Sequence, residues 1–354
     1  MKTVKITTDD ILVDNFFDIP EVEPGRVIIR TRQAGICGSD LHRMTELHAQ
    51  SDPAKHLFIG HEVSGDIYAV GEDVTNLDPG TRVAIEPIQR CTKCINCKSG
   101  KYTFCDQVDR RMAIGWNLSK PGGHSEYFDI PAYAAVPIPN SLSYTEGALV
   151  EPLAVGVHAI RMANPGHQAS IAVLGTGTIG LMCIAAAAEF VPRELICIYR
   201  HEHQRDAAQQ LGATRCIKAD KSCSPEDLSS KLNQLEKPDI VIEAVGGSSG
   251  SMDYAMELVR PSGTISITGA FWGESSININ PIVEKGLRIV GSICYNNSGN
   301  DISDFSQAIN LLSKRPQIAQ TMVTHQYAIE DAKTAYETAL DKSTGAIKVL
   351  LTCI

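Results

Sequence analysis

The pattern of hydrophobic and polar positions changes near residue 141. Before it, short β-rich runs such as 26–31, 63–70 and 82–85 are separated by glycine and proline, as in an all-β or barrel-like unit. After it, residues 144–163 show a helical pattern, and apolar strands then alternate with helical stretches. This alternation predicts β-α-β units on a parallel sheet. The predicted strands of this sheet are residues 170–174, 195–199, 239–243, 264–268 and 288–293.

The final sixty or so residues carry two helical patterns, at 302–312 and 329–340, and a terminal strand at 346–351. The pattern alone does not assign them to either unit. A chain of 354 residues with 43% hydrophobic residues forms two domains or one large domain. The sequence therefore predicts an α/β protein, with a β-rich unit followed by a doubly wound one.

Charge and hydropathy exclude two kinds of partner. With 41 acidic and 32 basic residues the net charge is −9, and the basic residues are scattered, so we expect no nucleic-acid partner. The longest apolar run, 179–188, is shorter than the roughly 20 residues that span a bilayer, and the N-terminus has no apolar signal region. We expect a cytoplasmic chain with no membrane partner. Eleven cysteines in such a chain need a reason other than disulfides.

The first chemical motif is a glycine-rich turn between a predicted strand and a predicted helix. Residues 175–180 read Gly-Thr-Gly-Thr-Ile-Gly. Gly175 permits the tight turn, Gly177 lets a pyrophosphate approach the backbone, and Gly180 lets helix and strand pack closely, with Thr178 and Ile179 between them. In this context the motif predicts a dinucleotide site at the helix N-terminus.

The end of the second strand of this unit bears on the choice of dinucleotide. The position that usually carries an acidic residue for the ribose of NAD is Tyr199, and Arg200 and Arg205 follow it. An arginine fork binds a 2′-phosphate, so NADP is favoured and NAD remains possible. The alternative is that both arginines are solvated and that Glu202 accepts the ribose hydroxyls.

A second motif places four cysteines in a short loop that carries three lysines and one glycine. Four thiolates at this spacing suit a closed tetrahedral zinc site, because so short a loop has no core of its own. Disulfides are the alternative and need an oxidising compartment. The four residues are Cys91, Cys94, Cys97 and Cys105.

Three further short runs of the sequence contain candidate ligands for a second zinc ion. Residues 35–42 read Gly-Ile-Cys-Gly-Ser-Asp-Leu-His, residues 60–62 Gly-His-Glu, and residues 151–153 Glu-Pro-Leu. With the four-cysteine loop and the glycine-rich turn, in this order, they resemble the zinc-dependent medium-chain dehydrogenase/reductase family, in its sorbitol, polyol and threonine dehydrogenase-like branch. The resemblance covers essentially the whole chain.

The resemblance implies a GroES-like β-barrel catalytic domain, split into residues 1–154 and 293–354, with a Rossmann NAD(P)-binding domain at 155–292. It also implies one catalytic and one structural zinc ion per chain, the latter in the four-cysteine loop. The catalytic ligands it implies are Cys37 and His61 with Glu62 or Glu151. Two carboxylates would make the centre anionic and fill the position that a catalytic zinc leaves open, so we expect Glu62 and Glu151 not to bind strongly together with substrate.

Such a centre would oxidise an alcohol by hydride transfer. Zinc lowers the pKa of bound water from about 15.7 to about 7, more than general base catalysis usually supplies. The resemblance implies that Ser39 and His42 carry the proton away, although a turn hydroxyl and a surface imidazole are the alternatives. It also places Arg43 and Tyr295 at the substrate. Because an arginine holds an anion bidentately, Arg43 favours a phosphate or carboxylate on the substrate, unless it is simply a surface residue.

These observations predict a zinc-dependent, NAD(P)-linked dehydrogenase that oxidises a secondary hydroxyl of a polyol, cyclitol, sugar phosphate or sugar acid to the ketone. A threonine 3-dehydrogenase shares the same ligand pattern and is one alternative. A non-catalytic zinc- and nucleotide-binding protein is the other. The expected partners are the small-molecule alcohol or ketone and further copies of the chain, in a homodimer or homotetramer.

Overall fold

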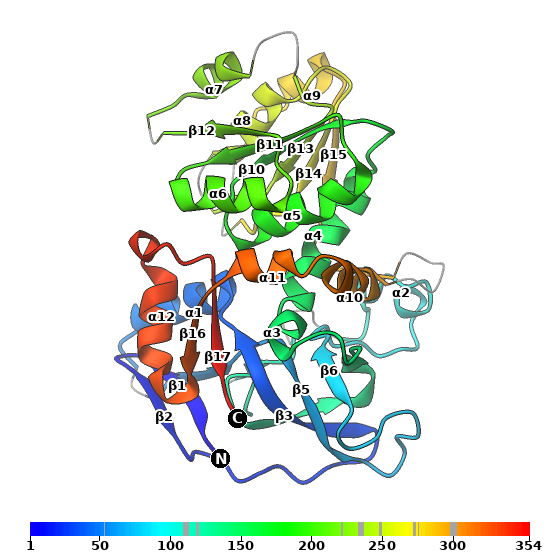
Figure 1. The fold of residues 1–354 in the computed structure, drawn as a ribbon, viewed down its shortest axis with the longest axis vertical. Helices are drawn as coiled ribbons and strands as arrows, with labels where there is room; N and C mark the ends of the chain where they lie inside the picture. The colour runs from blue at the N-terminus through cyan, green and yellow to red at the C-terminus, as the bar shows by residue number, and fades with distance from the viewer. Residues whose placement is uncertain are drawn as a thin grey trace. The chain divides into compact units, whose positions relative to one another are not determined.

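The computed structural model describes residues 1–52, 54–108, 113–117, 120–220, 222–232, 237–247, 250–271, 274, 276–297 and 303–354. The chain divides into two compact units. Met1–Glu151 and Asn296–Ile354 form the first, and Pro152–Tyr295 form the second (Figure 1). Each unit is described by itself below.

The first unit is built on two β-sheets. The larger has the order β16-β17-β3-β5-β6-β9, with β8 also paired to β3, and the smaller has the order β2-β1-β4-β7. Strand β17 pairs antiparallel with β3, so the C-terminal tail and the N-terminal part of the chain share one sheet. The strands are β1 (Thr3–Thr7), β2 (Ile11–Asp14), β3 (Arg26–Gly35), β4 (His56–Ile59), β5 (Glu62–Val70), β6 (Arg82–Ile85), β7 (Trp116–Asn117), β8 (Tyr127–Pro131), β9 (Ala135–Pro137), β16 (Val323–Ala328) and β17 (Lys348–Thr352).

Helices close the first unit from both ends of the sequence. Met44 and Leu47 of α1 and Tyr336 of α12 belong to one buried apolar cluster, which also includes residues of β1 and β17. The hydrophobic pattern predicts few helices before residue 141 and misses α1, whose first turn is polar. The helices are α1 (Gly38–His48), α2 (Ile95–Lys98), α3 (Tyr144–Gly147), α10 (Asp304–Lys314), α11 (Gln317–Met322) and α12 (Ala332–Leu340).

The second unit is a six-stranded parallel sheet in the order β12-β11-β10-β13-β14-β15. Numbered from β10, this is the order 3-2-1-4-5-6 of a dinucleotide-binding Rossmann fold, so the predicted fold class is confirmed for this unit. The strands are β10 (Ser170–Leu174), β11 (Glu194–Tyr199), β12 (Arg215–Lys218), β13 (Ile240–Glu243), β14 (Thr264–Ile267) and β15 (Arg288–Gly291). The helices are α4 (Val150–Ala163), whose first two residues belong to the first unit, α5 (Thr178–Ala187), α6 (Glu202–Leu211), α7 (Pro225–Lys231), α8 (Ser251–Leu258) and α9 (Asn280–Glu284).

Three expectations about elements differ from the structure. The single helix predicted at 144–163 is divided into α3 and α4. Strand β12 has no counterpart among the predicted strands, because four residues with charged ends carry no clear period. The helix predicted at 302–312 corresponds to α10, and residue 302 lies outside the described residues. None of the helices that the structure describes has the length and apolar character needed to cross a lipid bilayer.

Candidate functional site

Cys37 stands at the N-terminus of helix α1. Its backbone N–H donates to Oδ2 of Asp40 at 2.9 Å, and Asp40 is fully buried three residues into the helix. A carboxylate at this position caps the first turn of a helix. The capping contact therefore fixes the start of α1 and holds the Cys37 backbone in place.

His61 lies in the short link between β4 and β5, and Glu62 is the first residue of β5. Ligand atoms of Cys37, His61 and Glu62 all lie within 4.8 Å of one another, and both His61 and Glu62 are buried. Glycine is required at position 35, because a Cβ there would lie 2.2 Å from Oε2 of Glu62. A thiolate, an imidazole and a carboxylate at this separation are a donor set that fits zinc.

Two side chains orient the His61 ring. Nε1 of Trp116 donates to Nδ1 of His61 at 3.1 Å, and Oδ1 of Asp40 lies 3.4 Å from the same nitrogen. Both contacts are made by Nδ1, which leaves Nε2 as the ring nitrogen for a metal. Burial favours the neutral ring, but the charges of Asp40 and Cys37 outweigh it and raise the pKa of His61 well above its ordinary value. A metal that binds here displaces this proton.

A buried lysine holds the Glu62 carboxylate. Nζ of Lys348, on β17, donates to Oε1 of Glu62 at 2.7 Å, to Oε2 of the same carboxylate, and to the carbonyl of Ile36 at 3.1 Å. Both charged side chains are about 1% exposed. Glu62 therefore enters the site with its charge balanced by a fixed cation.

The other predicted residues of this site are placed as follows. Glu151 is buried in the first turn of α4 and acts electrostatically on Lys348, but it is not part of the three-residue group within the described chain. The Ser39 hydroxyl is buried and has no hydrogen-bond partner among the described residues. His42 is partly buried, with Nδ1 3.4 Å from Oε1 of Glu46.

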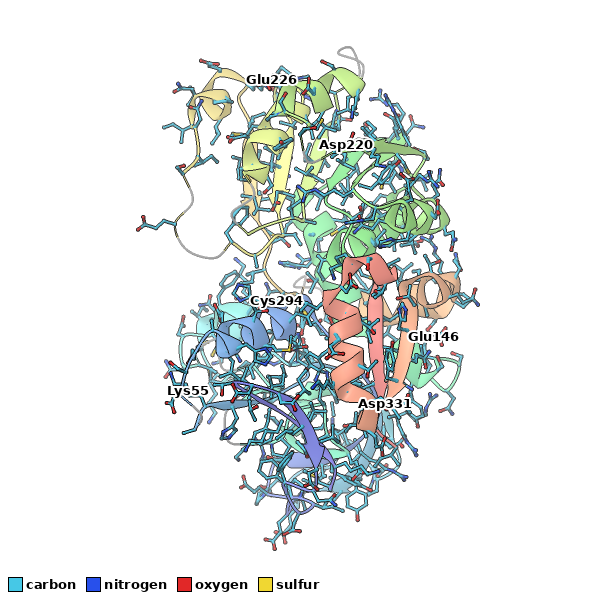
Figure 2. All side chains as sticks on the ribbon, turned by 90° about the vertical axis from the view of Figure 1, so that its left-hand side faces the viewer. Lys55, Glu146, Asp220, Glu226, Cys294 and Asp331 are labelled. Atoms are coloured by element: carbon cyan, nitrogen blue, oxygen red, sulfur yellow. The ribbon has the colours of Figure 1, made fainter. Side chains whose placement is uncertain are left out.

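Arg43 extends the site outward along α1. Its guanidinium lies over the Trp116 ring, 4.8 Å from the ring centroid, and its Nη1 is buried without a hydrogen-bond partner in the part of the chain that the structure describes. Arg43 also lines a pocket of about 430 Å³ together with Lys55 and His56. Figure 2 labels Lys55 at the surface of this unit. Trp116 thus contacts both His61 and Arg43.

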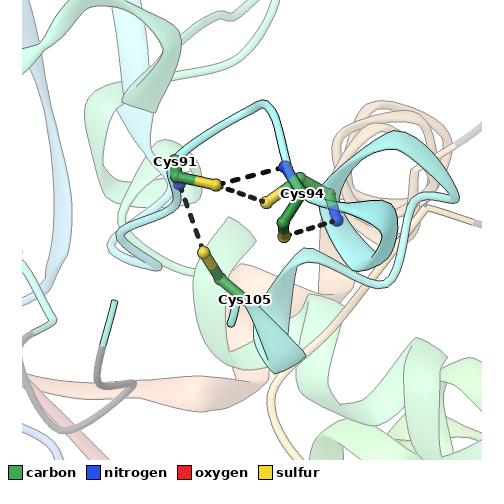
Figure 3. Close-up of side chains that lie close together, drawn as sticks. Cys91, Cys94 and Cys105 are labelled. Atoms are coloured by element: carbon green, nitrogen blue, oxygen red, sulfur yellow. Dashed lines mark hydrogen bonds between the residues drawn. The ribbon is translucent and has the colours of Figure 1, made fainter. Parts of the chain in front are cut away.

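The four cysteines of the loop converge as their spacing predicts. Their sulfur atoms all lie within 4.8 Å of one another, and backbone N–H groups of Cys91, Cys94 and Cys97 donate to neighbouring sulfurs at 3.3–3.4 Å (Figure 3). Burial raises the pKa of Cys97 to about 12. At Cys105, N–H groups of Cys91 and Gln107 outweigh desolvation and lower the pKa to about 6. Four sulfur atoms that converge at this separation fit a tetrahedral metal ion.

A stacked arginine fixes the base of this loop. The guanidinium of Arg90 lies between the rings of Tyr102 and Tyr133, at 4.1 and 4.7 Å from their centroids. It also pairs with Glu86 at 2.9 Å, and the Tyr102 hydroxyl donates to the same carboxylate. These contacts tie both ends of the cysteine loop to the β-sheet of the first unit.

In the second unit, the glycine-rich turn has the geometry expected of a dinucleotide site. Gly175 has a left-handed φ of 91°, and a Cβ on Gly180 would lie 1.8 Å from the carbonyl oxygen of Gly175. Gly177 caps the N-terminus of α5, and a Cβ there would meet no atom within 4 Å. Thr178 and Ile179 begin the helix. The turn therefore packs tightly on one side and stays open on the side where a pyrophosphate would bind.

The residues at and after the end of β11 differ in their exposure and in their ion-pair partners. Tyr199 is 8% exposed, whereas Arg200 is exposed. Arg205 pairs with Asp206 and Glu202, both at 2.6 Å, and Glu202 also receives Lys218 at 2.8 Å. Of the two arginines, Arg205 already has carboxylate partners. Tyr295, predicted at the substrate, ends the second unit and is fully buried.

Three contributors to the metal site were missed by the sequence reasoning. Asp40 stands in the quoted run and has the spacing of a capping box, which is a usable signal. Lys348 interrupts an apolar strand, and a charged residue in a buried strand is a second signal. Trp116 lies 55 positions from His61 and has no local sequence signal.

Family models match most of the chain. Residues 23–140 match the alcohol dehydrogenase GroES-like domain, and residues 178–314 match the zinc-binding dehydrogenase model. The chain is 31% identical over 338 residues to sorbitol dehydrogenase of Bacillus subtilis, covering 94% of this chain and 92% of that protein.

Solved structures give the same result. Galactitol-1-phosphate dehydrogenase of Escherichia coli superposes with a TM-score of 0.87 at 27% identity, covering 99% of this chain and all of that one. A zinc-binding dehydrogenase of Sinorhizobium meliloti bound to NADP gives a TM-score of 0.84 at 25% identity, covering 99% of this chain and 98% of that one. The chain belongs to the zinc-dependent medium-chain dehydrogenase/reductase family. The predicted GroES-like and Rossmann domains are thereby confirmed.

Proposed function

We propose that the protein oxidises a secondary hydroxyl of a polyol or of a phosphorylated or acidic sugar derivative to the ketone, with transfer of hydride to NADP. The observation that carries the proposal is the convergence of Cys37, His61 and Glu62 close to the Ser39 hydroxyl, which has no hydrogen-bond partner among the described residues. The similarity to dehydrogenases of sorbitol and galactitol 1-phosphate supports the substrate class.

In this proposal Cys37, His61 and Glu62 hold the catalytic zinc at rest. Zinc bound there would lower the pKa of an alcohol hydroxyl and so favour departure of hydride. Glu151 stays outside the ligand group and interacts with Lys348. The Ser39 hydroxyl accepts the substrate proton and passes it toward His42, three residues further along α1. Both residues face the same part of the helix, since positions three apart are neighbours.

The four-cysteine loop holds the second zinc. Its role is structural, because four thiolates leave no position for substrate. The support is the clustering of the four sulfurs and the backbone N–H groups aimed at them. The full protein would thus contain two zinc ions per chain.

Arg43 selects an anionic substrate. The support is its buried Nη1, which has no hydrogen-bond partner among the described residues, and Lys55, which lines the same pocket together with Glu46 and His56. A phosphate or carboxylate would supply the missing acceptor. The Trp116 ring packs against the Arg43 guanidinium and fixes its position.

NADP is the proposed cofactor because no carboxylate ends β11 and Arg200 is exposed there. The strength of this preference depends on Arg200, since Arg205 is engaged by two acidic side chains.

None of the eleven cysteines, all of which the structure describes, forms a disulfide, which supports a cytoplasmic location.

We also propose a homo-oligomer formed through the second unit. Strand β15 lies at an edge of its sheet, and Ile279 and Val283 just before it are 62% and 78% exposed. An unpaired edge beside exposed apolar side chains is suited to pairing with another copy. Sedimentation of the zinc-loaded protein tests this, and a monomer at micromolar concentration would contradict it.

The decisive experiment is a substrate screen combined with metal analysis. Neutral polyols, polyol phosphates, sugar acids and threonine would be tested with NADP and NAD by absorbance of the reduced cofactor. We expect two zinc ions per chain, highest kcat/KM with an anionic polyol and NADP, and loss of turnover after chelation that added zinc restores. Full turnover after exhaustive chelation, or a single zinc in active protein, would contradict the proposal.

A matched variant isolates the role of Arg43. Arg43→Ala should raise KM for an anionic polyol about tenfold or more, because charged hydrogen bonds contribute about 1.5–3 kcal/mol. KM for the neutral analogue should change little. Equal effects on both substrates would remove the assignment of an anionic group.

A further inference from the structure

Two cysteines outside both metal clusters are paired in the second unit. Cys197 of β11 and Cys216 of β12 are register partners on adjacent parallel strands. Neighbouring strands lie about 4.7–4.9 Å apart, which falls within the range of about 4.4–6.8 Å found between Cα atoms of disulfide-bonded cysteines. The backbone therefore already has the separation that a disulfide needs.

The two thiols share one face of the sheet. Side chains alternate between faces along a strand, and Ile196, Ile198 and Ile217 belong to the apolar cluster on one side. Cys197 and Cys216 consequently face the other side. The Cys216 thiol and the Thr176 hydroxyl both lie close enough to the Cys197 thiol to shift its pKa, the first upward and the second downward. The strand register therefore places the two sulfurs side by side on this face.

The pair lies beneath the dinucleotide turn. Thr176 is the second residue of that turn and is 3% exposed. Its hydroxyl donates to Oε1 of Gln204 at 3.3 Å, and the backbone N–H of Arg200 donates to the same oxygen at 3.4 Å. A line of contacts therefore runs from Cys197 through Thr176 and Gln204 to the start of α6.

The two cysteines differ in access to solvent. Cys197 is fully buried, whereas Cys216 is half-buried on β12, an edge strand of the sheet. Burial raises the pKa of both thiols. At Cys216 the neighbouring Cys197 thiol and the charge of Arg205 oppose this effect. Because Cys216 is the more accessible of the two, it is the thiol that meets a dissolved oxidant first, and because its raised pKa keeps the thiolate fraction small at neutral pH, the reaction is faster at high pH.

We propose that Cys197 and Cys216 form a redox-sensitive dithiol, which peroxide converts to a disulfide that weakens dinucleotide binding at the turn above. The Cys216 thiolate attacks hydrogen peroxide, which forms an S–O bond, breaks the O–O bond and releases hydroxide. The Cys197 thiol then attacks the sulfenic sulfur, forms the S–S bond and releases water. In sum, two thiols are oxidised and one peroxide is reduced to two waters.

The link to cofactor binding follows from the direction in which Cys197 moves. A bond to Cys216 draws the Cys197 sulfur toward β12 and away from Thr176, which follows β10 on the other side of β11. Thr176 then loses a buried partner, and the turn that must accept the pyrophosphate is less well supported. By linkage, bound NADPH should shift the equilibrium between dithiol and disulfide toward the dithiol by the same factor.

The test uses the full, zinc-loaded protein and hydrogen peroxide. After alkylation of residual thiols and digestion, mass spectrometry should find peptides of Cys197 and Cys216 joined with loss of two hydrogens. The Kd of NADPH should rise about five- to tenfold on oxidation, as expected for loss of one buried hydrogen-bonded contact. A thiol reductant should restore it.

Three variants separate this effect from oxidation of the zinc cysteines. Cys216→Ser retains all zinc thiols and should keep its NADPH affinity after peroxide, and Cys216→Ala should behave likewise. Cys223→Ser, a buried cysteine of the same unit without this register partner, should respond like the unaltered protein. Equal loss of affinity in Cys216→Ser, or absence of the joined peptides from oxidised protein, would overturn the proposal.

Discussion

Replacement of Lys348 by methionine should expose how strongly the Glu62 carboxylate depends on its buried cation. The two charged side chains are about 1% exposed, and Nζ contacts both carboxylate oxygens and the Ile36 carbonyl. Methionine preserves the length of the side chain but removes the charge and all three donors. The variant leaves a buried carboxylate without its partner.

Removing one partner of a buried ion pair typically costs about 3–5 kcal/mol. At about 2–4 °C per kcal/mol for a unit of this size, metal-free Lys348→Met should melt about 6–20 °C lower. Adding Glu62→Gln to this variant removes the unpaired charge, so the double variant should recover much of the loss. The difference between the single and double variants measures the coupling between the two charges.

Zinc provides the second readout. In Lys348→Met the Glu62 oxygens are available to a cation, so zinc should raise the melting temperature of the variant more than that of the unaltered protein. Thermal unfolding of chelator-treated and zinc-loaded samples checks both statements. The reasoning fails if metal-free Lys348→Met loses less than about 1 kcal/mol, well below the range for buried pairs. It also fails if the double variant is as unstable as the single one.

Further tests concern the glycine-rich turn, the Asp40 carboxylate near His61 and the Arg90 guanidinium beside the four-cysteine loop. Gly177→Ala should keep the melting temperature and weaken NADPH binding, whereas Gly180→Ala should lower stability, because its Cβ would meet a backbone carbonyl at 1.8 Å. Thermal unfolding and cofactor titration would show it, and equal stability of the two variants would contradict the packing argument. Asp40→Asn should weaken zinc binding at the Cys37 site about 10–100-fold, measured by competition with a chelator. Arg90→Lys should make the four-cysteine loop release zinc to a chelator more readily, because an ammonium group replaces the stacked guanidinium. An unchanged rate of zinc release would refute this.

The parts of the site that the sequence predicts are those whose partners are close in the chain. The glycine-rich turn needs only a strand before it and a helix after it, and its steric demands are visible in Gly175 and Gly180. The four cysteines lie within fifteen positions, so their spacing already implies convergence. Motifs of this kind can be predicted from the sequence, because all of their residues are close together in the chain.

The remaining parts depend on sheet pairing between distant segments. Lys348 reaches Glu62 because β17 pairs with β3, which in turn pairs with β5. No local pattern specifies this order of strands. Only the resemblance to a known family assigned residues 293–354 to the same domain as the N-terminal part of the chain. Trp116 reaches His61 in a similar way, since β7 pairs with β4 just before the histidine. A periodicity of two predicts a strand but not its neighbour.

This difference also explains why the charge of the metal site could not be counted from the sequence. From the ligand residues alone, Cys37 and Glu62 neutralise zinc, and Glu151 would make the centre anionic. The structure adds Lys348, whose positive charge lies against Glu62 and acts on Glu151. The electrostatic effect of the site on a bound alcohol therefore also depends on Lys348 and on Asp40 beside His61, neither of which is a ligand. A variant that removes Lys348 alters the metal centre without touching a ligand.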